Sequence, residues 1–190
     1  MQKRLDIRHA LLGDKKTKLK EEMTTSCGIA MMDGSGRYLL VKAGGPIFAR
    51  KERNYTFPKG EMMEGEEPEE CASLDFFEET GYRIDGSLTL VYEGKIRDDK
   101  RIMIFVSEGE FGGSITSNTC EIEFPPKSGK TITIPEVCDP MMMTEDEAEK
   151  VIFASQLPVI EELRKYKRHR YGCRNTKDGD GAAETDRPVL

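Results

Sequence analysis

Residues 60–82, GEMMEGEEPEECASLDFFEETGY, constrain this chain more than any other segment. They carry three acids, Asp75, Glu78 and Glu79, spaced three and four residues apart within a predicted helix. In a helix those spacings bring the side chains onto one face, within an arc of roughly 100°. Carboxylates that close repel one another unless they take up protons or share a divalent cation. The segment therefore predicts a site for a hard metal such as Mg²⁺.

The ends of this helix are marked by residues that favour helix termini. Pro68 suits the first helical turn, and the acids Glu69 and Glu70 favour the positive end of the helix dipole. Gly81 suits the left-handed conformation that often terminates a helix. The helix is therefore expected to begin near Pro68 and to end near Gly81.

Composition excludes several classes of protein. The 190 residues are enough for one domain with a core, and 37% hydrophobic with 34% charged residues is typical of a soluble globular protein. A net charge of −6 argues against general affinity for DNA or RNA. No apolar run approaches the roughly 18 to 20 residues that span a bilayer, so no membrane partner is expected.

The cysteines and the N-terminal sequence indicate a cytoplasmic location. The chain has 5 cysteines without a CxxC motif, which favours reduced thiols over a disulfide framework or a zinc site. The first residues, MQKRLDIRHALLGDKK, lack the apolar core of a secretory signal. No pattern in the sequence indicates an oligomeric state.

Changes in composition divide the chain into three parts. Residues 1–23 form a polar, lysine-rich extension, residues 24–167 form the globular domain, and residues 168–190 are expected to be a flexible tail. Within the extension, apolar residues predict a short helix that ends at Gly13; they are Leu5, Ile7, Leu11 and Leu12.

Alternating and continuous apolar runs predict the strands of the domain. Residues 26–33 and 37–43 are expected to form a hairpin, residues 44–61 an irregular segment, and residues 121–137 a loop interrupted by proline with one strand. Further strands are expected at 87–96 and 101–109, and helices at 145–153 and 156–167. A capping box of Thr144 and Glu147 marks the start of the first of these two helices.

The order of Gly60, Glu66 and residues 74–82 resembles the Nudix box, G-x5-E-x7-R-E-U-x-E-E-x-G-U, in which U is a bulky aliphatic residue. Seven of its nine specified positions match if Phe76 and Tyr82 count as bulky apolar residues. Flanking segments also match, and they include VKAGGPIFARK, YTFPKGE and SNTCEIEFPPKSG. On these residues the chain resembles the Nudix hydrolase family, in particular a bacterial branch of predicted nucleoside-polyphosphate pyrophosphohydrolases.

The resemblance implies a fold, a reaction and a cofactor. The fold is an α/β/α sandwich with a mixed sheet, in the α/β class. The reaction is hydrolysis of a nucleoside diphosphate linked to another group, and it requires Mg²⁺ or Mn²⁺. The PKGE turn is similar to that of members that cut diadenosine polyphosphates or diphosphoinositol phosphates. A dinucleoside polyphosphate is therefore the first expected substrate, with nucleoside triphosphates as an alternative.

The resemblance also implies roles for individual acids. Glu78 and Glu79 are expected to bind the metal, with Asp75 as a third ligand and the backbone carbonyl of Lys59 as a further one. Glu66 is the supporting acid before the helix. Glu136, in the sequence IPEV, is expected to act as a further ligand or as the general base.

Several other side chains are candidates for binding the substrate. The Lys59 ammonium is placed to contact phosphate as a compact cation. Weaker candidates for the same role are Lys42, Arg50, Lys51 and Lys127, and Tyr55 is a candidate for stacking on a base.

Two departures from the Nudix box leave rival functions open. Leu74 replaces the arginine that braces the glutamates, and Asp75 is one methylene shorter than the usual glutamate. One rival is therefore a nucleotide-binding module with weakened catalysis. Another is an RNA-associated pyrophosphohydrolase that uses the basic run at residues 165–174, KYKRHRYGCR.

Overall fold

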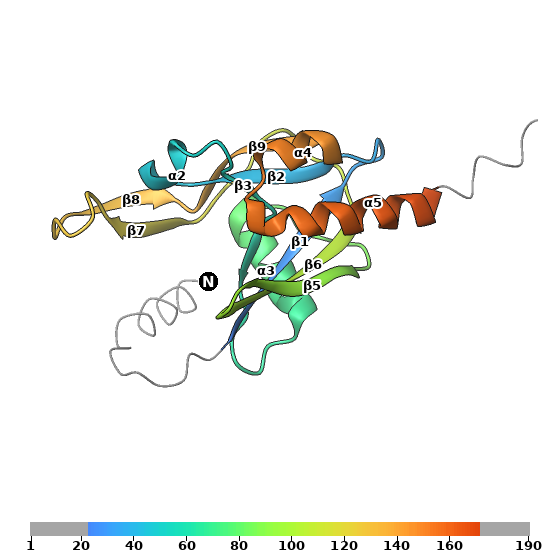
Figure 1. Ribbon diagram of the computed structural model, residues 1–190, viewed down its shortest axis with the longest axis horizontal. Coiled ribbons are helices and arrows are strands. Elements are labelled where there is room, and N and C mark those ends of the chain that lie inside the picture. Colours follow the sequence, from blue (N-terminus) through green and yellow to red (C-terminus); the bar gives the residue numbers. More distant parts are fainter. Residues whose placement is uncertain (1–22, 172–190) are drawn as a thin grey trace, which may run out of the picture.

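The computed structural model describes residues 23–171, and Figure 1 shows their arrangement. The expected helix that ends at Gly13 lies outside the described residues. The strands are β1 (Thr24–Met32), β2 (Tyr38–Ala43), β3 (Tyr55–Thr56), β4 (Lys59–Glu61), β5 (Thr89–Arg97), β6 (Lys100–Glu108), β7 (Thr119–Glu123), β8 (Thr131–Pro135) and β9 (Val137–Met143). The helices are α2 (Pro46–Ala49), α3 (Pro68–Thr80), α4 (Glu145–Val151) and α5 (Leu157–Tyr171), with a 3-10 turn at Ala154–Gln156.

Strand β1 lies at the centre of a mixed sheet. It pairs in parallel with β6 along its whole length, from Thr24 opposite Lys100 to Met32 opposite Glu108. It also pairs in antiparallel with β4 and, at one position, with β2. The sheet order is β3-β2-β1-β6-β5, and β9 pairs with β2. The expected mixed sheet is confirmed.

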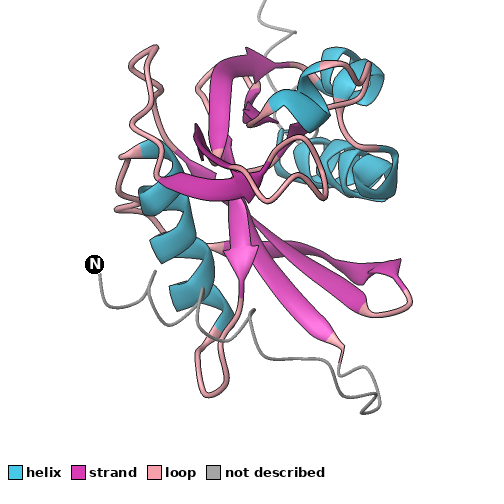
Figure 2. Ribbon diagram, turned by 90° about the vertical axis from the view of Figure 1, so that its left-hand side faces the viewer, coloured by secondary structure: helices cyan, strands magenta, loops and turns pink. Residues whose placement is uncertain are grey.

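Helices cover both faces of this sheet, as Figure 2 shows. Alternate residues of a strand point to opposite faces, so β1 contributes to two hydrophobic clusters. Cys27, Ile29 and Met31 pack with residues of α3, whereas Ala30 and Met32 pack in the cluster that contains the apolar residues of α5. The architecture is the expected α/β/α sandwich.

The turn between β1 and β2 is confirmed, but the two strands separate directly after it. Met32 opposite Tyr38 is the position at which they pair. Asp33 holds the turn, because its Oδ1 accepts the N–H groups of Ser35 and Arg37 at 2.9 Å each. The rest of β2 lies between β3 and β9, so the hairpin serves mainly to reverse the chain.

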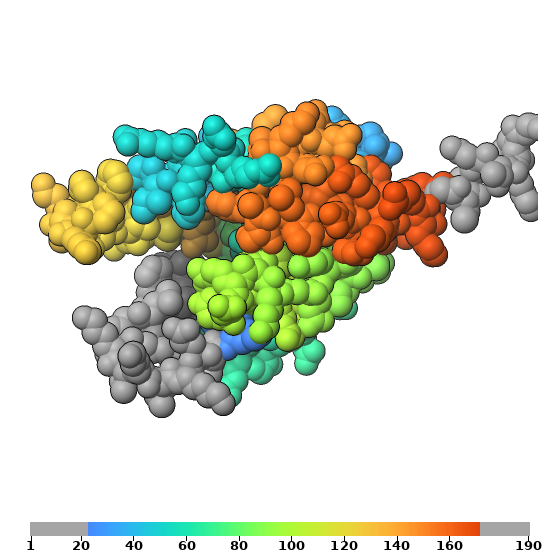
Figure 3. All heavy atoms as spheres, in the orientation of Figure 1, coloured from blue at the N-terminus to red at the C-terminus, as the bar shows by residue number. Residues whose placement is uncertain are grey.

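Two predictions of irregular structure are wrong. Residues 44–61 contain α2, β3 and β4, which are too short to produce a periodic pattern in the sequence. Residues 121–137 form most of the β7–β8 hairpin and the start of β9. Pro125 and Pro126 lie in the turn and Pro135 is the last residue of β8, so the alternating strands stay intact. The hairpin projects beside α2 (Figure 3). Its half-buried residues include Ile122 opposite Ile132.

The C-terminal helix is longer than expected. Helix α5 continues to Tyr171, so residues 168–171 are helical and not part of a tail. Contacts on this last turn explain the extension, since Arg170 and Tyr171 both reach the carboxylate of Glu108, at 2.8 and 3.0 Å. Among the described residues, no helix is long and apolar enough to cross a membrane.

Helix α4 begins with the predicted capping box. Thr144 accepts the backbone N–H of Glu147, and the Glu147 carboxylate accepts the backbone N–H of Thr144 at 2.8 Å. We expect Thr144→Ala to lower the free energy of unfolding by about 1 kcal/mol, a shift of roughly 2–4 °C in Tm. Thermal unfolding followed by circular dichroism measures this. The control Ser87→Ala, at an exposed loop serine, should leave Tm unchanged, and an equal shift in both variants would contradict the assignment.

Candidate active site

Helix α3 carries the predicted acids, and its ends lie where the sequence placed them. Pro68 occupies the first turn, and Gly81 is left-handed with φ 79° and donates its N–H to the carbonyl of Phe77 at 2.8 Å. The buried residues Cys71, Ala72 and Phe76 fix the helix against the sheet. The helix thereby brings its acids close to β4, which pairs with the same central strand.

Glu79 interacts directly with Lys59 at the start of β4. The backbone N–H of Lys59 donates to Oε2 of Glu79 at 3.0 Å, and both residues are half-buried. Burial raises the pKa of Glu79 to about 8, although the positive charge of Lys59 favours the ionised form. Burial likewise lowers the pKa of the Lys59 ammonium, against the attraction of Glu79. An acid and a base therefore share a poorly solvated position at the end of the β3–β4 turn.

Asp75 lies behind this pair and is only 2% exposed. Its carboxyl group packs directly on Gly60, where any Cβ would overlap it. Cys71 precedes Asp75 by about one helical turn on α3, and its Sγ lies 3.3 Å from Oδ2 of Asp75. The negative charges of Asp75 and Glu136 both disfavour ionisation of Glu79 and so raise its pKa, which indicates that these three acids are gathered in one region.

The base of the β7–β8 hairpin brings Glu136 to the end of α3. The N–H of Asn118 donates to the carbonyl of Glu78 at 3.2 Å, and the N–H of Glu136 donates to the carbonyl of Asn118 at 2.9 Å. Gly44 fixes the other side of this junction, since its N–H donates to the carbonyl of Glu136 and a Cβ on Gly44 would overlap Pro135. Glu78 itself is 8% exposed.

These acids are gathered, but their side chains do not form a closed ligand cage. Within residues 23–171, no three His, Cys, Asp or Glu side chains lie close enough together to enclose a metal ion. The donor chemistry nevertheless fits Mg²⁺ or Mn²⁺, because the candidates are carboxylate oxygens and the carbonyl of Lys59. Burial is the main cause of the raised pKa of Glu79, and the charges of Glu136 and Asp75 add to it; a bound cation would favour the ionised form of this carboxyl group.

A family model described as the NUDIX domain matches residues 23–151, which is more than half of the chain. The chain belongs to the Nudix family. This match includes β1 to β9, α3 and α4, so it covers the acids of α3 and the junction that carries Glu136. No curated protein sequence matches this Nudix protein.

Solved structures share the fold of this Nudix protein at low sequence identity. An Ap4A hydrolase from C. elegans has a TM-score of 0.56 and 14% identity, over 77% of this chain and 99% of the other. The ORF135 protein of E. coli has a TM-score of 0.52 and 15% identity, over 79% of this chain and 94% of the other. The MutT protein of Methanosarcina mazei Go1 has a TM-score of 0.50 and 14% identity, over 81% of this chain and 99% of the other. At this identity the similarity demonstrates the fold.

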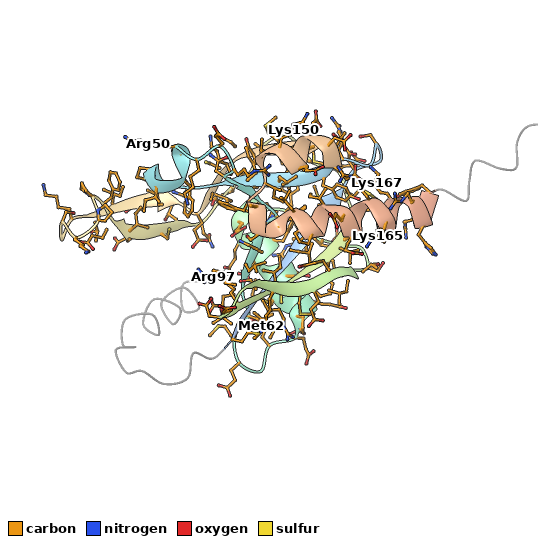
Figure 4. The ribbon with its side chains drawn as sticks, in the orientation of Figure 1. Arg50, Met62, Arg97, Lys150, Lys165 and Lys167 are labelled. Carbon is orange, nitrogen blue, oxygen red and sulfur yellow. The ribbon has the colours of Figure 1, made fainter. Side chains whose placement is uncertain are left out.

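The remaining candidate side chains of this Nudix domain lie in separate groups. Lys42 is next to Tyr55 across β2 and β3 and pairs with Asp139 at 3.4 Å. Arg50 and Lys51 are exposed after α2, and Figure 4 shows Arg50 on the outside of that segment. Lys127 is exposed in the turn of the hairpin, and Glu66 accepts the N–H of Met63 at 3.0 Å in the loop before α3. Their roles stay predictions.

The basic run on α5 is largely engaged in ion pairs. Figure 4 shows Lys165 and Lys167 on this helix. Lys165 pairs with Glu162 at 2.7 Å, Lys167 with Glu145 at 2.9 Å, and Arg170 with Glu108 at 2.8 Å. A surface that binds nucleic acid needs cations directed toward phosphates. These pairs give no support to an RNA-binding role for the helix.

Two residues of the site, Cys71 and Asn118, were not identified from the sequence. Cys71 stands four residues before Asp75, and this spacing places both on the same side of a helix. This spacing could have identified Cys71 from the sequence. The role of Asn118 could not be predicted, because its contact with Glu78 joins segments 40 residues apart through backbone atoms.

Proposed function

We propose that this protein hydrolyses a phosphoanhydride bond in a nucleoside diphosphate linked to a second group, and that it requires Mg²⁺ or Mn²⁺. The observation that carries the proposal is the gathering of Lys59, Asp75 and Glu136 around Glu79, in a poorly solvated region. Membership of the Nudix family supports hydrolysis of such nucleotides.

Four groups of the chain would hold the metal: the carboxylates of Asp75, Glu78 and Glu79 and the carbonyl of Lys59. When bound, the ion supplies Lewis-acid polarisation of a phosphate oxygen and lowers the pKa of a water molecule. Glu136 reaches this region from the hairpin base, where it can accept a proton.

In the proposed reaction, Glu136 takes the proton of the attacking water while the water oxygen bonds to phosphorus. The anhydride P–O bond breaks, and the leaving phosphate keeps the electron pair. The Lys59 ammonium contacts the phosphate oxygens and offsets their negative charge. Glu66 acts at a distance, since it fixes the loop that leads into α3.

We propose a dinucleoside polyphosphate as the first substrate to test. The PKGE turn that led to this expectation consists of Pro58 and strand β4. Its Lys59 contacts Glu79 through the backbone N–H. The fold similarity to an Ap4A hydrolase is compatible with this choice. Nucleoside triphosphates are the second class, compatible with the similarity to a MutT protein.

A nucleotide panel tests the function. Phosphate release is measured with dinucleoside polyphosphates, nucleoside triphosphates and nucleotide sugars, each with Mg²⁺, Mn²⁺ or chelator. We expect turnover on at least one of them that chelator abolishes. Binding of nucleotides without turnover on any of them would contradict hydrolysis and favour the module weakened by Leu74 and Asp75.

Replacing Lys59 should lower activity on the substrate more than it lowers the stability of the fold. Lys59→Met removes the ammonium but keeps the backbone N–H that holds Glu79. Because a hydrogen bond to a charged group contributes roughly 1.5–3 kcal/mol, we expect kcat/KM to fall about 10- to 100-fold. Lys150→Met, at an exposed lysine on α4, is the control and should match wild type in the same steady-state assay. Equal kcat/KM in the Lys59 variant and wild type would contradict phosphate contact.

A further inference from the structure

Cys71 contacts the most deeply buried acid of the site. It lies on α3 four residues before Asp75, so their side chains are neighbours on the helix surface. The distance from Sγ to Oδ2 is 3.3 Å, and the two residues are 0% and 2% exposed. An ionised carboxylate can only accept hydrogen bonds, so the thiol is the donor.

The surroundings leave the Asp75 carboxyl group little freedom. Gly60 packs against it with no space for a Cβ, which blocks movement toward β4. The Cys71 sulfur also lies 3.9 Å from the Gly60 carbonyl, so the thiol stands at the junction of helix and strand. Asp75 is one methylene shorter than glutamate, and its orientation therefore depends strongly on the groups that touch it.

The Cys71 sulfur lies beside strand β1. Cys27 and Cys71 are both fully buried in the cluster between β1 and α3, and their thiols interact. The Cys27 sulfur is 3.9 Å from Sδ of Met62, in the loop before α3 that Figure 4 shows. The thiol that contacts Asp75 thus belongs to a packed group of sulfur atoms.

We propose that Cys71 is a positioning residue for the metal site, and that its S–H group fixes the orientation of the Asp75 carboxylate. Groups that hydrogen-bond to metal ligands fix their orientation, and loss of such a group typically lowers metal affinity or activity 10- to 100-fold. Cys71 stands outside the specified positions of the Nudix box. The role rests on the proposed function, since it concerns the same divalent ion.

The test compares three variants without relying on turnover. Mn²⁺ binding to the substrate-free protein is measured from the electron paramagnetic resonance signal of free Mn²⁺, and stability is measured by thermal unfolding. Cys71→Ala removes the donor, Cys71→Ser keeps an O–H donor at nearly the same size, and Cys27→Ala removes a neighbouring buried thiol that is not bonded to Asp75. The last variant controls for the cost of a small cavity.

The expected pattern separates hydrogen bonding from packing. Cys71→Ala should bind Mn²⁺ at least about tenfold more weakly, while Cys71→Ser and Cys27→Ala should stay within about twofold of wild type. Wild-type affinity in Cys71→Ala would overturn the role of the thiol, and so would equal losses in Cys71→Ala and Cys27→Ala. If Cys71→Ala does not fold, the serine variant decides, since a tenfold loss there overturns the proposal.

Failure of the proposed function gives a different result. Wild-type protein that binds no Mn²⁺ overturns both the metal site and the role of Cys71. Wild-type protein that binds Mn²⁺ and hydrolyses a nucleotide, beside variants that bind Mn²⁺ equally well, overturns the role of Cys71 alone.

Discussion

Replacing Glu79 with glutamine is expected to lower turnover at least about 100-fold and to leave Tm close to that of wild type. Removal of one preorganised electrostatic group from an active site typically costs 10²–10³ in kcat, and Glu79 is proposed to hold the metal. The fold should tolerate the change, because the glutamine carbonyl can still accept the N–H of Lys59 that Oε2 accepts at 3.0 Å.

A matched variant on the same helix makes this prediction specific. Glu69→Gln changes an exposed acid in the first turn of α3 and should keep turnover within about twofold of wild type. Steady-state kinetics with saturating Mn²⁺ measure both variants, and thermal unfolding checks their folding. Wild-type turnover in Glu79→Gln would refute the role of this residue.

Gly60→Ala is expected to reduce both stability and activity. A Cβ at this position would overlap the Asp75 carboxyl group, so the helix, the strand or the carboxylate must shift. Overpacking of a buried contact typically costs about 1–3 kcal/mol, and a displaced Asp75 should also weaken metal binding. We therefore expect a lower Tm together with a loss of Mn²⁺ affinity in the resonance assay described above.

The control for Gly60→Ala is Gly34→Ala in the β1–β2 turn. A Cβ on Gly34 would meet only Oε1 of Glu110, at 3.6 Å, which is ordinary van der Waals contact. This variant should keep wild-type Mn²⁺ affinity. If Gly60→Ala also keeps the Mn²⁺ affinity and the Tm of wild type, then Asp75 is not held against Gly60.

Local signals in the sequence correctly predicted the bounds of α3, the start of α4 and the turn before β2. The bounds of α3 follow from Pro68 and Gly81, which act within one turn of the helix. The capping box of Thr144 and the turn before β2 are equally local. The sandwich could also be predicted, because the family resemblance depends on residues spread over most of the domain.

Contacts between distant segments could not be predicted in this way. The three acids of α3 share a helix, but Asp75 is buried behind Gly60 and the described side chains do not enclose an ion. The partner of Glu79 is a backbone N–H, which no side-chain pattern reveals. The β7–β8 hairpin was missed because its prolines were expected to interrupt strands, whereas Pro125 and Pro126 lie in the turn and Pro135 is the last residue of β8.

The most direct test of the metal site is anomalous scattering from crystals soaked in Mn²⁺ with a non-hydrolysable substrate analogue. We expect a manganese peak within coordination distance of the Glu78 and Glu79 carboxylates, with the Lys59 ammonium against a phosphate. Manganese bound elsewhere, or none at these acids under conditions that support turnover in solution, would contradict the account.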